Sequence, residues 1–208
     1  MRSDVLLIAR PGRAPHIECT GGIAARRTGP DTVHLVSSAA TPLGGDSIAM
    51  RVVVEEGARL SVRTVAATIT LPGARTDESH ASWALDVAGE LDFDPEPTIV
   101  AATSRHFCST ALTLAGTARL RLRERVQIGR TGERQGFWSG SLRADVDGSP
   151  LLRHRVELGA GSPADDEIAA PRATVSEFRY PHGEFDTIGV SLALAGGGCL
   201  ATWQGERL

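Results

Sequence analysis

Apolar and polar residues alternate with a period of two along most of this chain, as half-buried β-strands do. Several alternating segments flank a short turn that contains Gly, a pattern typical of β-hairpins. These paired segments cover residues 52–54 with 60–62, 85–87 with 91–93, 112–114 with 120–122, and 192–194 with Leu200. A fifth hairpin is predicted at Asp147-Gly148, and residues 162–170 form either a short helix or a loop.

The pattern predicts an all-β fold of stacked or sandwiched, mostly antiparallel hairpins with at most one or two short helices. The first Leu of the second strand recurs at intervals close to 30 residues, at Leu60, Leu91, Leu120 and Leu151. Such a period indicates a repeated β unit that stacks on its neighbours. The alternative is that short strands and tight turns produce these echoes in any antiparallel protein.

The length of 208 residues predicts a single domain over residues 1–208. Aromatic residues make up only 4% of the chain, so the core must consist mainly of Val, Leu, Ile and Ala. All 22 basic side chains are Arg. The absence of Lys excludes a Schiff-base Lys and a P-loop Lys. A net charge of −3 argues against general nucleic-acid binding.

Three cysteines lie far apart, at Cys19, Cys108 and Cys199, which favours neither a zinc knuckle nor a disulfide framework. The apolar run at residues 5–9 is too short for a signal peptide core or a membrane span. We therefore expect a soluble, cytoplasmic protein with no membrane or nucleic-acid partner.

Two carboxylates stand out by their surroundings in the sequence. Asp46 follows Gly44-Gly45 and is either an oxygen ligand at a turn or a turn residue that bonds its own backbone. Glu96 lies between Pro95 and Pro97, which hold it in an extended segment. That rigidity suits cation or partner binding, and it equally suits a segment that ends strand pairing.

His106 and Cys108 are two residues apart and share one face of a predicted strand. Imidazole and thiolate together suit nickel, copper or zinc, although two ligands are too few for a closed site, and buried Cys is common. His182 and Glu184 form a weaker pair in a predicted loop.

An Arg row at positions 119, 121, 123 and 125 occupies one strand face and must meet carboxylates, solvent or a partner protein. The sequence contains no nucleophile elbow, HExxH or GxGxxG motif. A binding or assembly module is therefore favoured over an enzyme.

Segments in order along residues 34–158 resemble the UreD/UreH family of urease accessory proteins. They are His34-Leu35-Val36, Pro42-Leu43-Gly44-Gly45-Asp46, Glu56-Gly57-Ala58-Arg59-Leu60, Thr64-Val65-Ala66-Ala67-Thr68, Glu96-Pro97-Thr98-Ile99, Arg105 with Phe107, Arg123-Glu124-Arg125-Val126, Gly129-Arg130, Gly132-Glu133, and Leu142-Arg143-Ala144-Asp145-Val146-Asp147-Gly148. The family pattern Gln-Ala-Ala-Thr-Lys is replaced here by residues 65–69, which end in Ile69. Residues 159–208 match poorly and are expected to form divergent C-terminal strands.

The resemblance implies a non-enzymatic all-β scaffold. With UreF and the GTPase UreG it would engage the urease apoprotein, as a homodimer of heterotrimers, for GTP-dependent nickel insertion. It implies transient nickel but no tightly bound cofactor, and UreF docking near the C-terminal region. By motif position, the residues expected to guide or transiently bind nickel are Asp46, Thr68, Glu96, Glu124 and Glu133. Glu124 and Glu133 are alternatively structural partners of Arg123, Arg125 and Arg130.

Two other functions remain open at this point. Acidic residues at Asp92, Asp94 and Glu96 fit a β-structured carbohydrate-active enzyme, which needs a carboxylate pair in a groove with aromatic platforms. The repeat spacing fits a self-assembling structural β protein. The first is disfavoured by the scarcity of aromatics. Size-exclusion chromatography that shows a monodisperse, partner-dependent species would count against the second.

Overall fold

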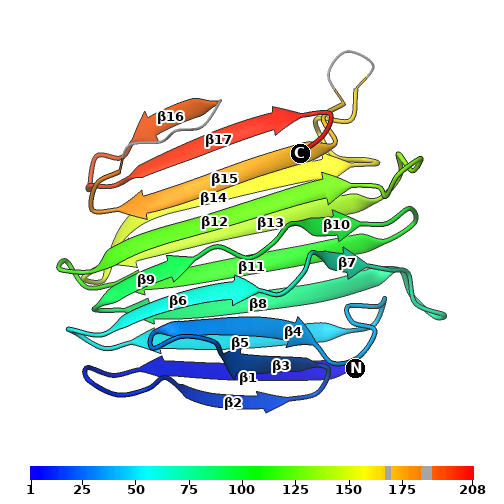
Figure 1. The fold of residues 1–208 in the computed structure, drawn as a ribbon. Coiled ribbons are helices and arrows are strands. Elements are labelled where there is room, and N and C mark those ends of the chain that lie inside the picture. The colour runs from blue at the N-terminus through cyan, green and yellow to red at the C-terminus, as the bar shows by residue number, and fades with distance from the viewer. Residues whose placement is uncertain (167–169, 184–188) are drawn as a thin grey trace.

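The computed structural model describes residues 1–166, 170–183 and 189–208, and all regular elements in these ranges are strands. They form two stacked layers (Figure 1). One sheet has the order β14 (Ser149–Gly159), β13 (Phe137–Val146), β11 (Arg105–Leu114), β8 (Glu78–Val87), β5 (Ser47–Val54), β1 (Arg2–Ala9) and β2 (His16–Thr20). The described residues contain no helix that could cross a membrane.

The second sheet has the order β16 (Val190–Ala193), β17 (Cys199–Gly205), β15 (Ala173–Tyr180), β12 (Arg119–Ile128), β9 (Glu90–Phe93), β6 (Arg59–Thr64), β4 (Thr32–Ser37) and β3 (Ile23–Arg27). Two short strands, β7 (Thr68–Thr70) and β10 (Thr98–Val100), extend this layer, with β10 paired to β12. The all-β prediction is confirmed.

The chain coils from one layer to the other, so neighbouring strands in the middle of each sheet run parallel. This holds for β1, β5, β8, β11 and β13 in one layer and for β4, β6, β9 and β12 in the other. Antiparallel pairs occur at the ends of the sheets, for example β1 with β2 and β15 with β17. The expectation of mostly antiparallel hairpins is therefore corrected to a mixed arrangement with a parallel centre.

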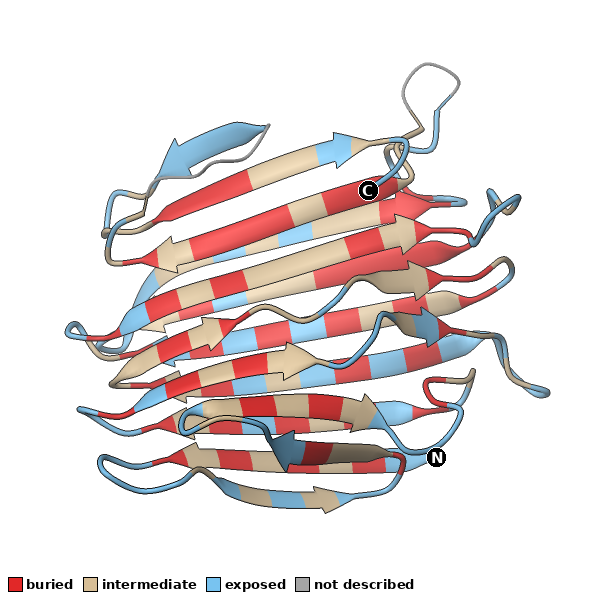
Figure 2. Ribbon diagram, viewed as in Figure 1, coloured by how far each residue is buried: buried red, intermediate tan, exposed pale blue. Residues whose placement is uncertain are grey.

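Three of the predicted hairpins are instead connections between the layers, because β5 and β6, β8 and β9, and β11 and β12 each belong to different sheets. A hairpin and a connection between layers give the same alternation of apolar and polar residues, because both bury every second residue of each strand (Figure 2). The hairpin at Asp147-Gly148 is confirmed by the antiparallel pair β13–β14, and the last one by β16–β17.

The period near 30 residues reflects true stacking. Leu60 pairs with Leu91, and Leu91 with Leu120; all three are buried in one core cluster. In the facing sheet Val52, Leu85 and Leu112 form a matching row in the same cluster. Leu151 breaks the series because it lies on β14, in the other sheet.

The second sheet contains a gap beside β12. One run of strand ends at Phe93 and resumes at Thr98, and its neighbour ends at Thr64 and resumes at Thr68. β12 is continuous. Of its residues, 119–122 pair with β9 and 126–128 pair with β10, so residues 123–125 face the gap. Pro95 and Pro97 lack the N–H that a continuing ladder needs. The predicted end of strand pairing at Glu96 is therefore confirmed.

Replacement of Leu91 by Ala tests the stacked core. Leu91 is 1% exposed and lies between two Leu of the same row, so its truncation leaves a cavity that the neighbouring strands cannot fill. We expect Leu91→Ala to lower the free energy of unfolding by about 2–5 kcal/mol in denaturant titrations. Leu192→Ala, on a side chain that is 51% exposed, is the matched control and should change stability little. Equal effects of the two substitutions would contradict the stacked core.

Candidate functional site

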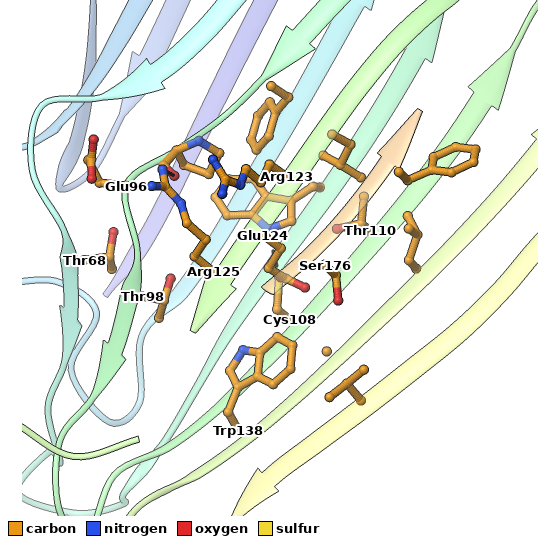
Figure 3. A pocket seen from close by; sticks show the side chains of 18 of the residues that line it. Thr68, Glu96, Thr98, Cys108, Thr110, Arg123, Glu124, Arg125, Trp138 and Ser176 are labelled. Atoms are coloured by element: carbon orange, nitrogen blue, oxygen red, sulfur yellow. Dashed lines mark hydrogen bonds between the residues drawn. The ribbon is translucent and has the colours of Figure 1, made fainter. Parts of the chain in front are cut away.

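A cavity of about 90 Å³ lies between the two sheets at the gap beside β12 (Figure 3). Its polar lining includes five of the residues singled out in the sequence: Thr68, Glu96, His106, Cys108 and Glu124. Glu96 is exposed to solvent, whereas His106 and Cys108 are buried. The cavity therefore connects the protein surface at the gap with the interior of the sandwich.

A second cavity of about 210 Å³ adjoins the first. It extends under residues 65–67, which join β6 to β7. The two share six lining residues, namely Leu35, Thr64, Thr68, Trp83, Thr98 and His106. The hollow space thus follows the interruption in the second sheet.

The cavity lies where the core divides into two apolar clusters. Along the inward face of β12, Leu122 belongs to the larger cluster and Val126 to the smaller one, with Glu124 between them. Along β11, Leu112 and Cys108 belong to the larger and the smaller cluster respectively. Polar side chains thus occupy the boundary between two hydrophobic regions.

One hydrogen bond holds the sulfur of Cys108: the indole Nε1–H of Trp83 donates to Sγ over 2.8 Å. Thr110 and Glu124 line the same cavity. Burial raises the pKa of the Cys108 thiol well above its usual value, so the thiol is neutral.

Glu124 points into the cavity and its two neighbours in the sequence, Arg123 and Arg125, also line it (Figure 3). Burial raises the pKa of Glu124 to about 7. No ion pair joins Glu124 to an Arg within the described part of the chain. The alternative role as a structural partner of Arg123 and Arg125 is therefore wrong for Glu124.

Two histidines complete the polar lining. The Nδ1 of His106 lies 2.9 Å from the Ser79 hydroxyl, and burial lowers the pKa of His106 to about 4, so its ring is neutral. The Nε2 of His154 is buried without a hydrogen-bond partner. His106 and Cys108 share an inward face as predicted, but they are not bonded to each other: His106 lies against Ser79 and Cys108 accepts from Trp83. Among the described residues, no three His, Cys, Asp or Glu side chains converge as a metal site.

Asp46 and Glu133 lie outside the cavity, and the carboxylate of each bonds atoms of its own turn and one backbone nitrogen from elsewhere in the chain. The buried Asp46 carboxylate accepts hydrogen bonds from the Thr41 hydroxyl and the Leu43 N–H, both at 2.9 Å, and pairs with the amino group of Met1. Glu133 accepts from Arg130 and from the backbone N–H groups of Arg130 and Ala102.

Hydrogen bonds from the side chain and backbone of Arg130 lower the pKa of Glu133 to about 2. The alternative role of Glu133 as a partner of Arg130 is confirmed.

The Arg row of β12 meets carboxylates, as one of its interpretations predicted. Arg121 contacts Asp94 at 3.0 Å and Glu177 at 3.0 Å, and Arg125 contacts Asp94 at 3.1 Å. Asp92 is likewise paired with Arg121. Asp92 and Asp94 are thus engaged in ion pairs, which removes the observation that favoured a carbohydrate-active enzyme. Of the weaker pair at 182 and 184, Glu184 lies outside the described residues.

The family model described as "UreD urease accessory protein" matches residues 23–178. This chain belongs to the UreD family. It is 40% identical over 180 residues to the UreD protein of Frankia casuarinae, covering 78% of this chain and 56% of the relative. It is 39% identical over 194 residues to UreD 1 of Saccharopolyspora erythraea, covering 87% and 74% respectively.

The chain thus spans little more than half the length of the first of these UreD proteins. Membership of the UreD family confirms the resemblance seen in residues 34–158, and the match continues to residue 178, on β15. Sequence reasoning missed that Cys108 and Glu124 line one cavity, and it missed the contributions of Trp83 and His154. One signal was present: Glu124 continues the inward series of Leu120, Leu122 and Val126, so its carboxyl had to enter the core.

Replacement of Glu124 by Gln tests whether its carboxyl is buried. The folded-state pKa is near 7 and the unfolded value is lower, so the folded state binds more protons between these values. The contribution of Glu124 to stability therefore falls as pH rises from about 4.5 to 7. We expect Glu124→Gln to gain stability relative to the wild type over this range, by about 3 kcal/mol at most.

The measurement is the difference in free energy of unfolding between the two proteins at pH 5 and pH 8. The difference is needed because His106, whose pKa is lowered, changes the wild-type curve in the opposite sense. Glu96→Gln changes an exposed side chain and is the control. Its free energy of unfolding should differ from that of the wild type by the same amount at pH 5 and at pH 8. Parallel curves for Glu124→Gln would contradict the buried carboxyl.

Proposed function

We propose that this chain is a non-enzymatic urease maturation factor that acts with UreF and the GTPase UreG in the GTP-dependent insertion of nickel into the urease apoprotein. Membership of the UreD family supports this role, and the relatives carry the name of accessory proteins. Nickel is then cargo in transit, and the chain needs no resident cofactor.

The observation that carries the proposal is the polar cavity at the gap in the second sheet. It offers Thr68 and Glu96 near the surface and Glu124 inside. Oxygen donors bind Ni²⁺ weakly enough to release it, unlike a closed thiolate site. The cavity therefore suits a cation that enters and leaves.

The surface at the gap also suits contact with a partner protein. Val65 is 64% exposed and Ile69 is 45% exposed, on either side of Thr68. They stand where the family pattern has Gln and Lys. Apolar side chains at the entrance favour a docked protein that shields the cation from solvent. Val190 and Leu192 of β16 are also exposed, and these apolar side chains support docking of UreF on this strand. The assembly in this proposal is a homodimer of heterotrimers in the cytoplasm.

Co-expression with the other urease operon products tests the role. Without this chain, urease should contain little nickel, because the path into the apoprotein is missing. The measurement is nickel per purified urease, together with a pull-down of UreF-like and apo-urease proteins on this chain. Full nickel loading in its absence would refute the maturation role.

Replacement of Glu96 and Glu124 by Gln tests the path itself. We expect each variant to lower nickel per urease several-fold, because each removes a charged oxygen donor from the cavity while keeping side-chain volume. Glu56→Gln, an exposed carboxylate on the β5–β6 connection, is the matched control and should load normally. If both cavity variants also load normally, nickel takes another route.

A further inference from the structure

The two ends of the sandwich are built differently. At one end the consecutive strands β2 and β3 are the last strands of their respective sheets, so the chain itself joins the two layers there. At the other end the first sheet stops at β14, whereas the second continues past β15 through β17 to β16. Figure 1 shows β16 beyond the edge of the other layer. The second sheet therefore overhangs the first at this end.

The overhang leaves apolar side chains uncovered on the inward face of β16. Leu122, Phe178 and Leu200 lie in one row across successive strands and are at most 8% exposed. Leu192 continues this row as the partner of Leu200, yet it is 51% exposed, and Val190 on the same face is 61% exposed. Leu200 still shares a cavity with side chains of β14. β17 is thus the last strand that the first sheet covers.

β14 presents a free strand edge at the same place. It is the longest strand among the described residues and pairs only with β13 within them. Strand edges that stay unpaired are commonly short or broken by Pro, but Pro150 lies at the start of β14 and leaves residues 151–159 able to pair. A Cβ on Gly196, in the turn after β16, would lie 2.9 Å from Leu151 of β14. The free edge and the overhang therefore border one space.

We propose that β14 accepts an extended segment of a partner protein as an additional strand, in which apolar and acidic side chains alternate. The apolar side chains would cover Val190 and Leu192, and the acidic ones would meet the Arg side chains on the outer face of β14. The proposal deepens the docking proposed for β16 and rests on it in part, but the binding can be measured without urease or nickel.

The charges on the outer face favour acidic residues in the added strand. Arg143 and Arg153 are directly opposite each other on β13 and β14, where like charges destabilise a sheet. Arg143 is exposed and has no ion-pair partner within the described ranges. Arg153 and Arg155 pair with Asp145 and Glu157, but ion pairs between exposed side chains contribute little. A carboxylate beside these three Arg side chains would relieve their repulsion.

The shape of the space favours a strand over a helix. β16 lies one strand beyond β17, and neighbouring strands are about 4.8 Å apart. An α-helix with its side chains is roughly 10 Å wide and leaves the backbone groups of β14 unpaired. An added strand takes affinity from main-chain hydrogen bonds and specificity from alternate side chains. It would satisfy the edge and cover the overhang together.

Titration of a fluorescein-labelled synthetic peptide of alternating Val and Glu with the purified full chain tests the site by fluorescence polarisation. We expect binding to the wild type, weakened at least about tenfold in the double variant Arg153→Glu, Arg155→Glu and in Leu192→Asp. Arg51→Glu, on an exposed side chain of β5 in the same sheet, is the matched control and should bind normally. A peptide with the same Val and Glu residues in two separate blocks has the same charge and should bind far more weakly.

Amide hydrogen exchange provides a second readout. The alternating peptide should slow exchange along β14 and leave β2, the edge strand at the other end of this sheet, unchanged. Absence of binding to the wild type, equal binding of the block peptide, or normal binding by the variants of β14 and β16 would overturn the proposal. A wild-type dimer in sedimentation that these variants dissociate would also overturn it, because the occupant would then be a second copy of this chain.

The two proposals fail in distinguishable ways. If the alternating peptide binds at β14 but urease loads fully without this chain, the strand-addition site stands and the maturation role falls. If urease depends on the chain but the peptide does not bind, the maturation role stands and the strand-addition site falls.

Discussion

In-register stacking of apolar side chains between two layers is the constraint on which the rest of this structure depends. Leu60, Leu91 and Leu120 occupy equivalent positions on successive parallel strands, so each coil of the chain must deliver the same face to the core. Where the register is complete, as at Leu91, the interior is closed. The cavity lies where two coils in succession interrupt their strands at the same level, since β6 and β9 both stop before β7 and β10 begin.

The stacked core also explains how polar groups are tolerated inside. Two apolar clusters lie on either side of the cavity, and the polar side chains are grouped at their boundary. Cys108 accepts a hydrogen bond from Trp83 there, and Glu124 faces the cavity, where its carboxyl is not enclosed by apolar side chains alone. A carboxyl placed within either cluster would have no polar neighbour, so the gap in the sheet and the inward Glu124 depend on each other.

The sequence predicted the all-β class, the repeat near 30 residues and five of the residues that line the cavity. It missed the coiling between layers, because alternation reports which residues are buried and not which strand lies alongside. Asp46 and Glu133 were grouped with the cavity residues by motif order, yet their carboxylates bond atoms of their own turns. The common cavity of Cys108 and Glu124 could not be found either, since these residues reach it only because β11 and β12 lie in facing sheets.

The absence of Lys gains a structural meaning at the gap. Residues 123–125 of β12 stay paired with β15 but have no strand partner on the side of β9 and β10, and Arg side chains bridge the gap on that side. Arg125 donates to the Pro95 carbonyl at 2.6 Å and to Asp94 at 3.1 Å, and Arg121 donates to Asp94 and Glu177. A guanidinium presents five N–H donors in a fixed plane, whereas an ammonium is a compact point charge. The Arg row therefore holds the segment around Glu96 at the entrance without closing the sheet, and this keeps a path into the core open.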